Sequence, residues 1–252
     1  MTEKCTFSLL LMFVWADKWG MSFNVSKCKV MHVGRNNQEY EYTMRGQKLE
    51  KTDEERDIGV MVTKNLKPSA QCEKAAGRAM PVLNQLKRNF HYRDRHTFPR
   101  LYKQYVRPHL EFSVQAWSPW LVGDIERLEK VQEKAVRMVA GLKGKEYAER
   151  CLELGLETLE QRRQKQDMAL VYKMTKDDQM TSMFEKVRSN SQGARTRQTT
   201  AHQGLAVQYA RTDIRKHSFA VRIVEKWNHL PDTVKMAPNK ESFKRGLNQA
   251  TL

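Results

Sequence analysis

The sequence of 252 residues contains few cysteines, and none of them lies near another. The four cysteines occupy positions 5, 28, 72 and 151, so no pair has the CxxC or CxxH spacing of a zinc site. This pattern argues against a zinc site and against a disulfide framework. It is typical of a reducing compartment, and we expect an intracellular protein, nuclear or cytoplasmic.

Long hydrophobic runs are also missing. The apolar run SLLLMFVW near the start is far shorter than the ~20 residues needed to span a bilayer. The residues that follow it, ADKWG, lack the small-residue cleavage site of a signal peptide. We therefore interpret the run as the buried face of a helix that carries Trp15, and we expect no membrane partner.

The common signatures of catalysis do not occur either. The sequence has no phosphate-cradling glycine loop and no HExxH motif, and its seven histidines are scattered. The acidic stretches at 53–57 (DEERD) and 176–178 (KDD) read as solvated charge runs, and Asp17 is a single acid between two tryptophans. We expect no catalytic residue, no metal site and no cofactor in this chain.

Positive charge, in contrast, is abundant and unevenly distributed. The formal net charge is +16. Residues 71–120 carry 9 basic and 3 acidic side chains, and residues 181–252 carry 13 and 5. A polyanion partner, nucleic acid above all, is the natural inference. A basic surface that serves solubility is the alternative.

The spacing of apolar residues predicts strands first and helices later. Residues 21–62 alternate at the period of strands. Arg45-Gly46 is typical of a tight hairpin, and Gly59 inside the run RDIGVMV suggests a bulge or a close backbone approach. We expect a small antiparallel sheet within residues 22–63.

After Pro68 the period becomes helical. A first apolar stripe would contain Ala75, Ala79, Val82, Leu86 and Phe90, with Pro81 inside it at a cost of ~3 kcal/mol or a bend. Thr97 would cap a second helix, which Pro108 would kink or end.

Three further segments complete the helical part. The third helix would bury Ile125, Leu128, Val131, Ala135 and Met138, with Gly141 as its C-cap. After it we expect two helices separated at Gly155 and a basic linker over residues 187–204. A last helix would bury the residues Phe219, Ile223, Val224 and Trp227.

Basic residues with interleaved aromatics mark the first two helices as a candidate nucleic-acid-binding surface. His91 and Tyr92 could stack on bases or sugars. The cations that could follow phosphates are Arg78, Lys87, Arg88, Arg93, Arg95, Arg100, Lys103 and Arg107. The same residues could instead form an exposed face beside an aromatic core.

Six stretches in order resemble one known family. They are WADKWGMSFNVSKCKVMHVG, DIGVMV, LYKQYVRPHLEFSVQAWSPW, IERLEKVQEKAVRMVAGLKG, LELGLETLEQRR and FAVRIVEKWNHLPDTVKMAPNKESFKRGL. From about Trp15 onward, the chain resembles the carboxyl-terminal part of the reverse transcriptases of non-LTR (LINE-type) retrotransposons, the jockey-like branch in particular. The first residues and Pro81 depart from the family pattern, which suggests a truncated copy.

The resemblance implies an α+β fold and a domain order. Residues 1–66 would be the remnant of a polymerase palm, 67–143 a helical thumb, 144–186 a helical extension, 187–204 the linker and 205–252 a C-terminal helical segment. Asp57, Ile58, Gly59 and Val60 match the strand and turn that position the primer end in the family.

The resemblance also implies a function. The family's catalytic aspartates, which hold Mg²⁺ in the intact polymerase, lie upstream of the matched region. We therefore expect a fragment of an RNA-directed DNA polymerase that is inactive alone. Its expected partners are RNA or an RNA–DNA duplex and the missing upstream half of the polymerase. A domesticated, non-catalytic nucleic-acid-binding module and a helical protein–protein scaffold are the alternatives.

Overall fold

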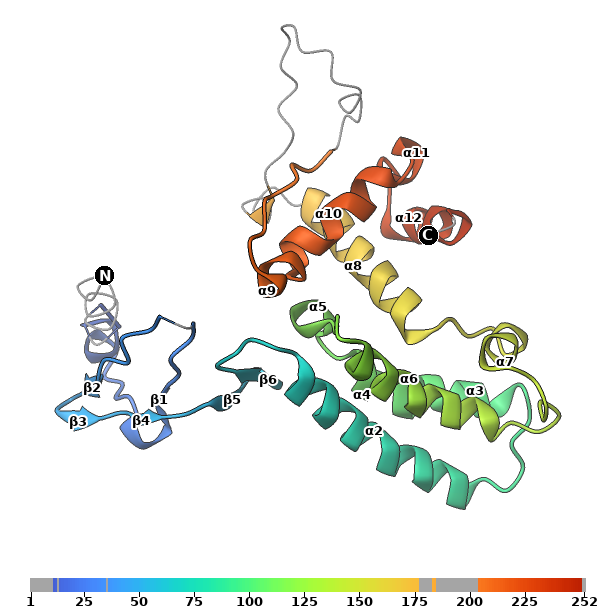
Figure 1. Ribbon diagram of the computed structural model, residues 1–252, viewed down its shortest axis with the longest axis horizontal. Helices are drawn as coiled ribbons and strands as arrows, with labels where there is room; N and C mark the ends of the chain where they lie inside the picture. Colours follow the sequence, from blue (N-terminus) through green and yellow to red (C-terminus); the bar gives the residue numbers. More distant parts are fainter. Residues whose placement is uncertain (1–10, 13, 35, 177–182, 185–203, 251–252) are drawn as a thin grey trace, which may run out of the picture. The chain divides into compact units, whose positions relative to one another are not determined.

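The computed structural model combines short strands with helices, as an α+β fold requires (Figure 1). It describes residues 11–12, 14–34, 36–176, 183–184 and 204–250. The chain divides into two compact units. The strand unit comprises the described residues up to 57 together with 62–66, and the helical unit comprises 58–61 and the described residues from 67 onward. Each unit is described by itself.

The strand unit begins with a short helical segment at residues 14–18. Ala16 is buried, but Trp15 and Trp19 are 56% and 65% exposed. The expectation that Trp15 lies on a buried face is therefore wrong. The unit's described strands are too short to provide an apolar surface that could cover two indoles.

Three separate two-stranded sheets replace the single antiparallel sheet that the sequence predicts. A short 3₁₀ helix, η1 (Val25–Lys27), precedes the first strand. The strands are β1 (Lys29–Val30), β2 (Thr43–Met44), β3 (Gln47–Lys48), β4 (Glu50–Lys51), β5 (Glu54–Asp57) and β6 (Val60–Thr63). The pair β1–β4 is parallel, which corrects the expected antiparallel arrangement. Parallel pairing is possible because the connection from β1 to β4 is long and contains the whole β2–β3 hairpin.

Two hairpin turns have the same backbone conformation. Arg45 (φ 52°) and Gly46 (φ 76°) join the antiparallel strands β2 and β3, which confirms the predicted hairpin. Ile58 (φ 43°) and Gly59 (φ 91°) join β5 and β6 in the same way. Two successive positive φ angles are typical of the type I′ turn that matches the twist of paired strands. Gly59 therefore lies in a turn, and the expected bulge inside a strand is wrong.

The first core of the helical unit is formed by helices between residues 69 and 159. Their bounds are α2 (Ser69–Asn89), α3 (Thr97–Leu101), the π-helical turn η2 (Tyr102–Val106), α4 (Arg107–Glu111), α5 (Val114–Trp117), α6 (Val122–Arg137) and α7 (Tyr147–Glu153). Helices α2 and α6 lie side by side (Figure 1).

Helix α2 buries a stripe that differs from the predicted one at Val82, which is only half-buried, and at its end. Cys72, Ala75, Ala79, Leu83 and Leu86 are buried. The helix ends at Asn89, and Phe90 follows it in extended conformation, 38% exposed. Its predicted burial is therefore wrong, because an extended residue no longer follows the helical period.

Pro81 does not end helix α2. The helix runs through it, and Pro81 itself is exposed. The ring therefore contacts no neighbouring helix. The missing N–H removes one hydrogen bond within α2 and so destabilises this helix alone.

Residues 97–111 form one continuous helical path with a widened turn. The amide of Arg107 donates to the carbonyl of Tyr102, five residues earlier, which is the π-helical pattern. Pro108 follows directly, so the wide turn lies where a proline interrupts the ordinary ladder. Four buried side chains of this path recur every four residues: Phe98, Tyr102, Val106 and Leu110.

The start of this path corrects the predicted cap. Thr97 is the first helical residue and not the cap, and the Asp94 carboxylate accepts from the amides of His96 and Thr97, each at 2.7 Å. These two hydrogen bonds lower the pKa of Asp94, and the bond from the amide of Thr97 has the larger effect.

Helix α6 follows its prediction closely. Leu128, Val131 and Ala135 are buried. On its exposed side, Glu126 pairs with Lys130 and Glu133 pairs with Arg137, each four residues apart.

A second core lies at the C-terminal end of the helical unit. Its helices are α8 (Leu159–Lys176), α9 (Asp213–Lys216), α10 (Phe219–His229), α11 (Asp232–Lys235) and α12 (Lys240–Gln249). Ile223, Val224 and Trp227 are buried as predicted, and Gly155 (φ 57°) separates α7 from α8 as predicted. Helix α8 contacts α10 and α12 here, and α5 and α6 towards the first core. The predicted linker lies outside the described residues, apart from Gly204.

Candidate nucleic-acid interface

The loop of residues 90–96 follows α2 in the chain and is hydrogen-bonded to the residues just after α6. The amide of Ala140, just after α6, donates to the carbonyl of Arg93 at 2.8 Å. Nε of Arg93 donates to the carbonyl of Met138 at 3.1 Å, and Nη2 of Arg95 donates to that of Gly141 at 2.7 Å. Three hydrogen bonds therefore fix this loop against the end of α6.

Arg93 also closes the end of α2. Its Nη1 donates to the carbonyls of Lys87 and Phe90 at 3.1 and 3.2 Å. The last carbonyls of a helix have no partner within the helix, so a guanidinium that reaches two helix ends satisfies groups that would otherwise depend on water. Arg93 was predicted to follow phosphates, but in the structure it serves as an internal cap.

Arg95 has a similar internal role. Its Nη1 pairs with Glu153 at 3.1 Å while its Nη2 holds the carbonyl of Gly141. Gly141 (φ 78°) adopts the left-handed conformation, and a Cβ there would lie 3.1 Å from Nη2 of Arg95. The left-handed backbone therefore favours glycine here, and any other side chain would also displace the guanidinium slightly. It lies after Met138, the residue that caps α6 in the structure, so its predicted role as the cap itself is wrong.

Two further predicted cations are bound within the helical unit. Nζ of Lys103 donates to the carbonyl of Gly155 at 3.3 Å, and burial lowers its pKa, with Arg107 adding to the effect. Nε of Arg107 lies 3.8 Å from Glu111, and burial, followed by the nearby Arg162, lowers its pKa. Both side chains are half-buried and already have partners within the helical unit, so they are less available to an external ligand than the exposed cations.

The remaining predicted cations are exposed. Arg78 lies in the middle of α2, Lys87 and Arg88 lie in its last turn, and Arg100 lies on α3. Lys143 was not among the predicted cations; it is exposed two residues after Gly141 and is therefore close to Arg95.

We call one group of exposed side chains the basic end. Its members lie in the loop that Arg93 and Arg95 hold in place or within a few residues of the segments next to it. They are Lys87, Arg88, Tyr92, Arg100 and Lys143. Tyr92 is 80% exposed, and its neighbour His91 is exposed as well, so both rings are available for stacking.

The four residues predicted to resemble a primer grip form the tip of the β5–β6 hairpin. Asp57 ends β5, Ile58 and Gly59 form the turn, and Val60 begins β6. Ile58 is 88% exposed. It also has a positive φ angle, which β-branched residues rarely adopt. An exposed apolar side chain held in a strained conformation is consistent with a contact outside the chain.

The described residues contain no group of three or more histidine, cysteine, aspartate or glutamate side chains that could hold a metal ion. Nor does any helix among them have both the length and the apolar character needed to cross a bilayer.

Comparison of the chain with models of protein families, with curated proteins and with solved structures gave no match.

Proposed function

We propose that this chain binds duplex nucleic acid, an RNA–DNA hybrid in particular, through phosphate contacts at the basic end. The observation that carries the proposal is that Lys87, Arg88, Arg100 and Lys143 are exposed around a loop that internal hydrogen bonds hold in place. Cations on a pre-organised surface bind phosphates without the cost of ordering a loop.

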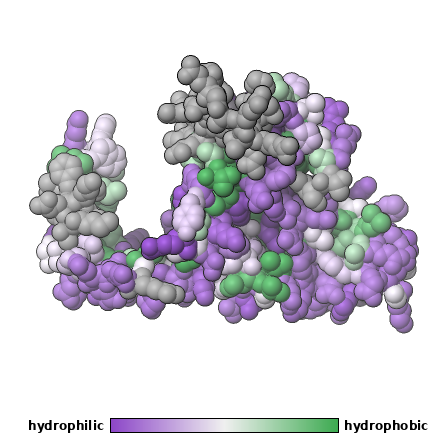
Figure 2. Space-filling model, turned by 45° about the horizontal axis from the view of Figure 1, so that its top comes forward, coloured by the Kyte–Doolittle hydropathy of each residue, from purple (hydrophilic) through white to green (hydrophobic). Residues whose placement is uncertain are grey.

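Such contacts position a duplex but do not read its sequence. Helices α2 and α6 both carry lysine and arginine in their last turns, and these cations are the groups that we expect to contact phosphates. We therefore expect little sequence preference. On the face drawn in Figure 2, hydrophilic residues cover most of the helical unit and hydrophobic ones form separate small areas, which also favours a polar partner on that face.

We extend the proposal to the family that the sequence resembles. The strand unit would correspond to the end of a reverse-transcriptase palm, and helices α2 to α6 would correspond to the thumb. The chain alone would not polymerise. A primer-extension assay with Mg²⁺ checks the last point, and templated synthesis by the purified chain would overturn it.

The decisive binding experiment removes exposed cations and leaves Arg93 intact. Lys87, Arg88 and Arg100 are each replaced by Gln, and the affinity for an RNA–DNA hybrid is measured as a function of salt. Each phosphate contact contributes about 0.9 to the slope of log K against log salt concentration, so the slope should fall by up to ~3 units.

A matched variant controls for total charge. Arg211, Lys216 and Lys226 are exposed on or just before α9 and on α10, and their replacement by Gln removes the same charge elsewhere in the helical unit. The control should keep the wild-type slope. Equal slopes in all three proteins would refute the basic end, and affinity without salt dependence would favour a protein–protein scaffold instead.

A further inference from the structure

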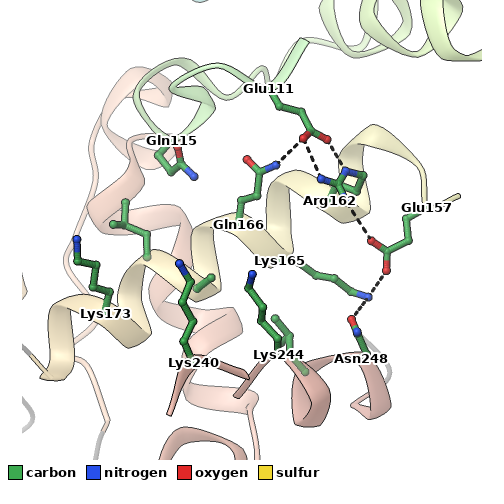
Figure 3. A pocket seen from close by; sticks show the side chains of 13 residues that line it. Glu111, Gln115, Glu157, Arg162, Lys165, Gln166, Lys173, Lys240, Lys244 and Asn248 are labelled. Atoms are coloured by element: carbon green, nitrogen blue, oxygen red, sulfur yellow. Dashed lines mark hydrogen bonds and ion pairs between the residues drawn. The ribbon is translucent and has the colours of Figure 1, made fainter. Parts of the chain in front are cut away.

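Helices α8 and α12 enclose a pocket of about 570 Å³ in the C-terminal core (Figure 3). Three contacts hold its walls in place. The rings of Tyr172 and Phe243 stack at 4.4 Å, the hydroxyl of Tyr172 donates to the carbonyl of Ala237 at 2.6 Å, and Nζ of Lys165 donates to Oδ1 of Asn248 at 2.7 Å. The pocket is therefore part of a packed structure and lies within the size range of ligand sites.

The acidic side chains of this pocket are already neutralised. Glu111 accepts two hydrogen bonds from Arg162, one of 2.9 Å from Nη2, and another of 2.9 Å from the amide of Gln166. Glu157 pairs with Lys165. Figure 3 shows these contacts together at one end of the pocket.

Three lysines at the other end have no such partner. Within the described ranges, Lys173, Lys240 and Lys244 form no ion pair with a carboxylate. Lys240 and Lys244 extend from α12 towards α8, which carries Lys173, and the amide of Gln115 lies on the far side (Figure 3). Five cations and two carboxylates line the pocket, which leaves a net charge of +3.

Two of these lysines, Lys240 and Lys244, are exposed and occupy positions that a bound anion would make more favourable. Lys240 is the first residue of α12, where the helix dipole disfavours a cation. Lys240 and Lys244 are like charges four residues apart on one helix, which also repel. A bound anion would relieve both effects.

We propose that this pocket binds a ligand with two or three linked phosphate groups. Ammonium groups bind phosphate as point charges, and Lys240 and Lys244 lie one helical turn, about 6 Å, apart along α12. A charge spread over several ångströms can engage both of them and Lys173, whereas a single carboxylate cannot. The apolar floor of Ala169, Leu170 and Leu247 excludes competing water from one side.

The phosphates could come from a free polyphosphate group or from the backbone of a nucleic-acid strand. The site lies in the C-terminal core and shares no residue with the basic end, so its test does not depend on the proposed function.

The test uses tripolyphosphate as the probe and the full chain as the protein. Binding is measured by calorimetry and by the rise in the unfolding temperature. Replacement of Lys173, Lys240 and Lys244 by Gln should weaken binding at least about tenfold and abolish the rise. The Arg211, Lys216 and Lys226 to Gln variant, with the same loss of charge, should keep both.

A second arm identifies the source of the phosphates. If a single-stranded oligonucleotide displaces tripolyphosphate from the wild-type protein, the pocket binds nucleic-acid backbone. If it does not, the ligand is a free polyphosphate. Absence of tripolyphosphate binding, or an equal loss in both variants, would overturn the proposal. Circular dichroism of the pocket variant confirms that it is folded.

Discussion

Arg222 is the side chain whose removal tests the packing of the C-terminal core most directly. Its Nε and Nη2 pair with the two carboxylate oxygens of Asp167 at 3.0 and 3.1 Å. Nη2 also donates to the carbonyl of Gln115 at 2.9 Å, and Nη1 donates to that of His217 at 3.0 Å. One guanidinium thus connects α10 to α8 and to α5.

The structure sets the size of the effect of Arg222→Met. The side chain of Asp167 is only 6% exposed, so the variant leaves a buried carboxylate without its cation. Breaking a buried pair from one side costs about 3–5 kcal/mol. Arg222 is itself 17% exposed, which lets water approach, so we expect about 3 kcal/mol, near the lower limit.

The loss should depend on pH. Burial raises the pKa of Asp167, while Arg222 lowers it. Without Arg222 the folded-state pKa rises further above the unfolded value. A raised carboxyl pKa means that the native state holds a proton that the unfolded state has lost, so the free energy of unfolding falls as pH rises between the two pKa values. The deficit of the variant should therefore be larger at about pH 8 than at about pH 5.

Urea unfolding followed by tryptophan fluorescence measures both quantities, because Trp227 is buried on the same helix. Arg211→Met, at an exposed arginine, is the matched control and should cost less than about 0.5 kcal/mol. Adding Asp167→Asn to Arg222→Met removes the uncompensated charge and should recover part of the loss. A deficit below about 1 kcal/mol, or one that is equal at the two pH values, would refute this reasoning.

Two further variants should stabilise the protein. Arg163 is 3% exposed, and neither its Nη1 nor its Nη2 has a hydrogen-bond partner among the described residues, so Arg163→Met should raise the free energy of unfolding by about 1–3 kcal/mol. If urea unfolding shows a lower free energy of unfolding for this variant, the guanidinium of Arg163 has a partner in the native protein. Pro81→Ala restores a hydrogen bond to the carbonyl of Gly77 inside α2 and should add about 1–3 kcal/mol; an unchanged unfolding temperature would mean that α2 has already adapted to the proline.

Features that depend on neighbouring residues were predictable from the sequence. The hairpin at Arg45-Gly46, the apolar side of α6 and the break at Gly155 all follow from local preferences, and the structure has them. The parallel pairing of β1 with β4 was not predictable, because a two-residue strand carries no signal of its partner.

The candidate site shows the same limit. The exposure of Lys87, Arg88 and Arg100 agrees with a simple reading of the charged segments. The internal roles of Arg93 and Arg95 depend on carbonyls 45 and 46 residues later, so nothing in their own segment distinguishes them from phosphate-binding cations. Lys240 and Lys244 are in helical register, but their pocket exists only because α8 packs against α12.

The wide turn at residues 102–106 has a consequence for how this helix can be recognised at all. A wheel drawn at 100° per residue spreads Phe98, Tyr102, Val106 and Leu110 over about 120°. The wide turn offsets part of that drift, and all four side chains reach the same core. Such a turn is equivalent to one residue inserted into an α-helix. Sequence comparisons that forbid gaps inside helices will therefore misalign one half of this segment against a relative without the extra residue.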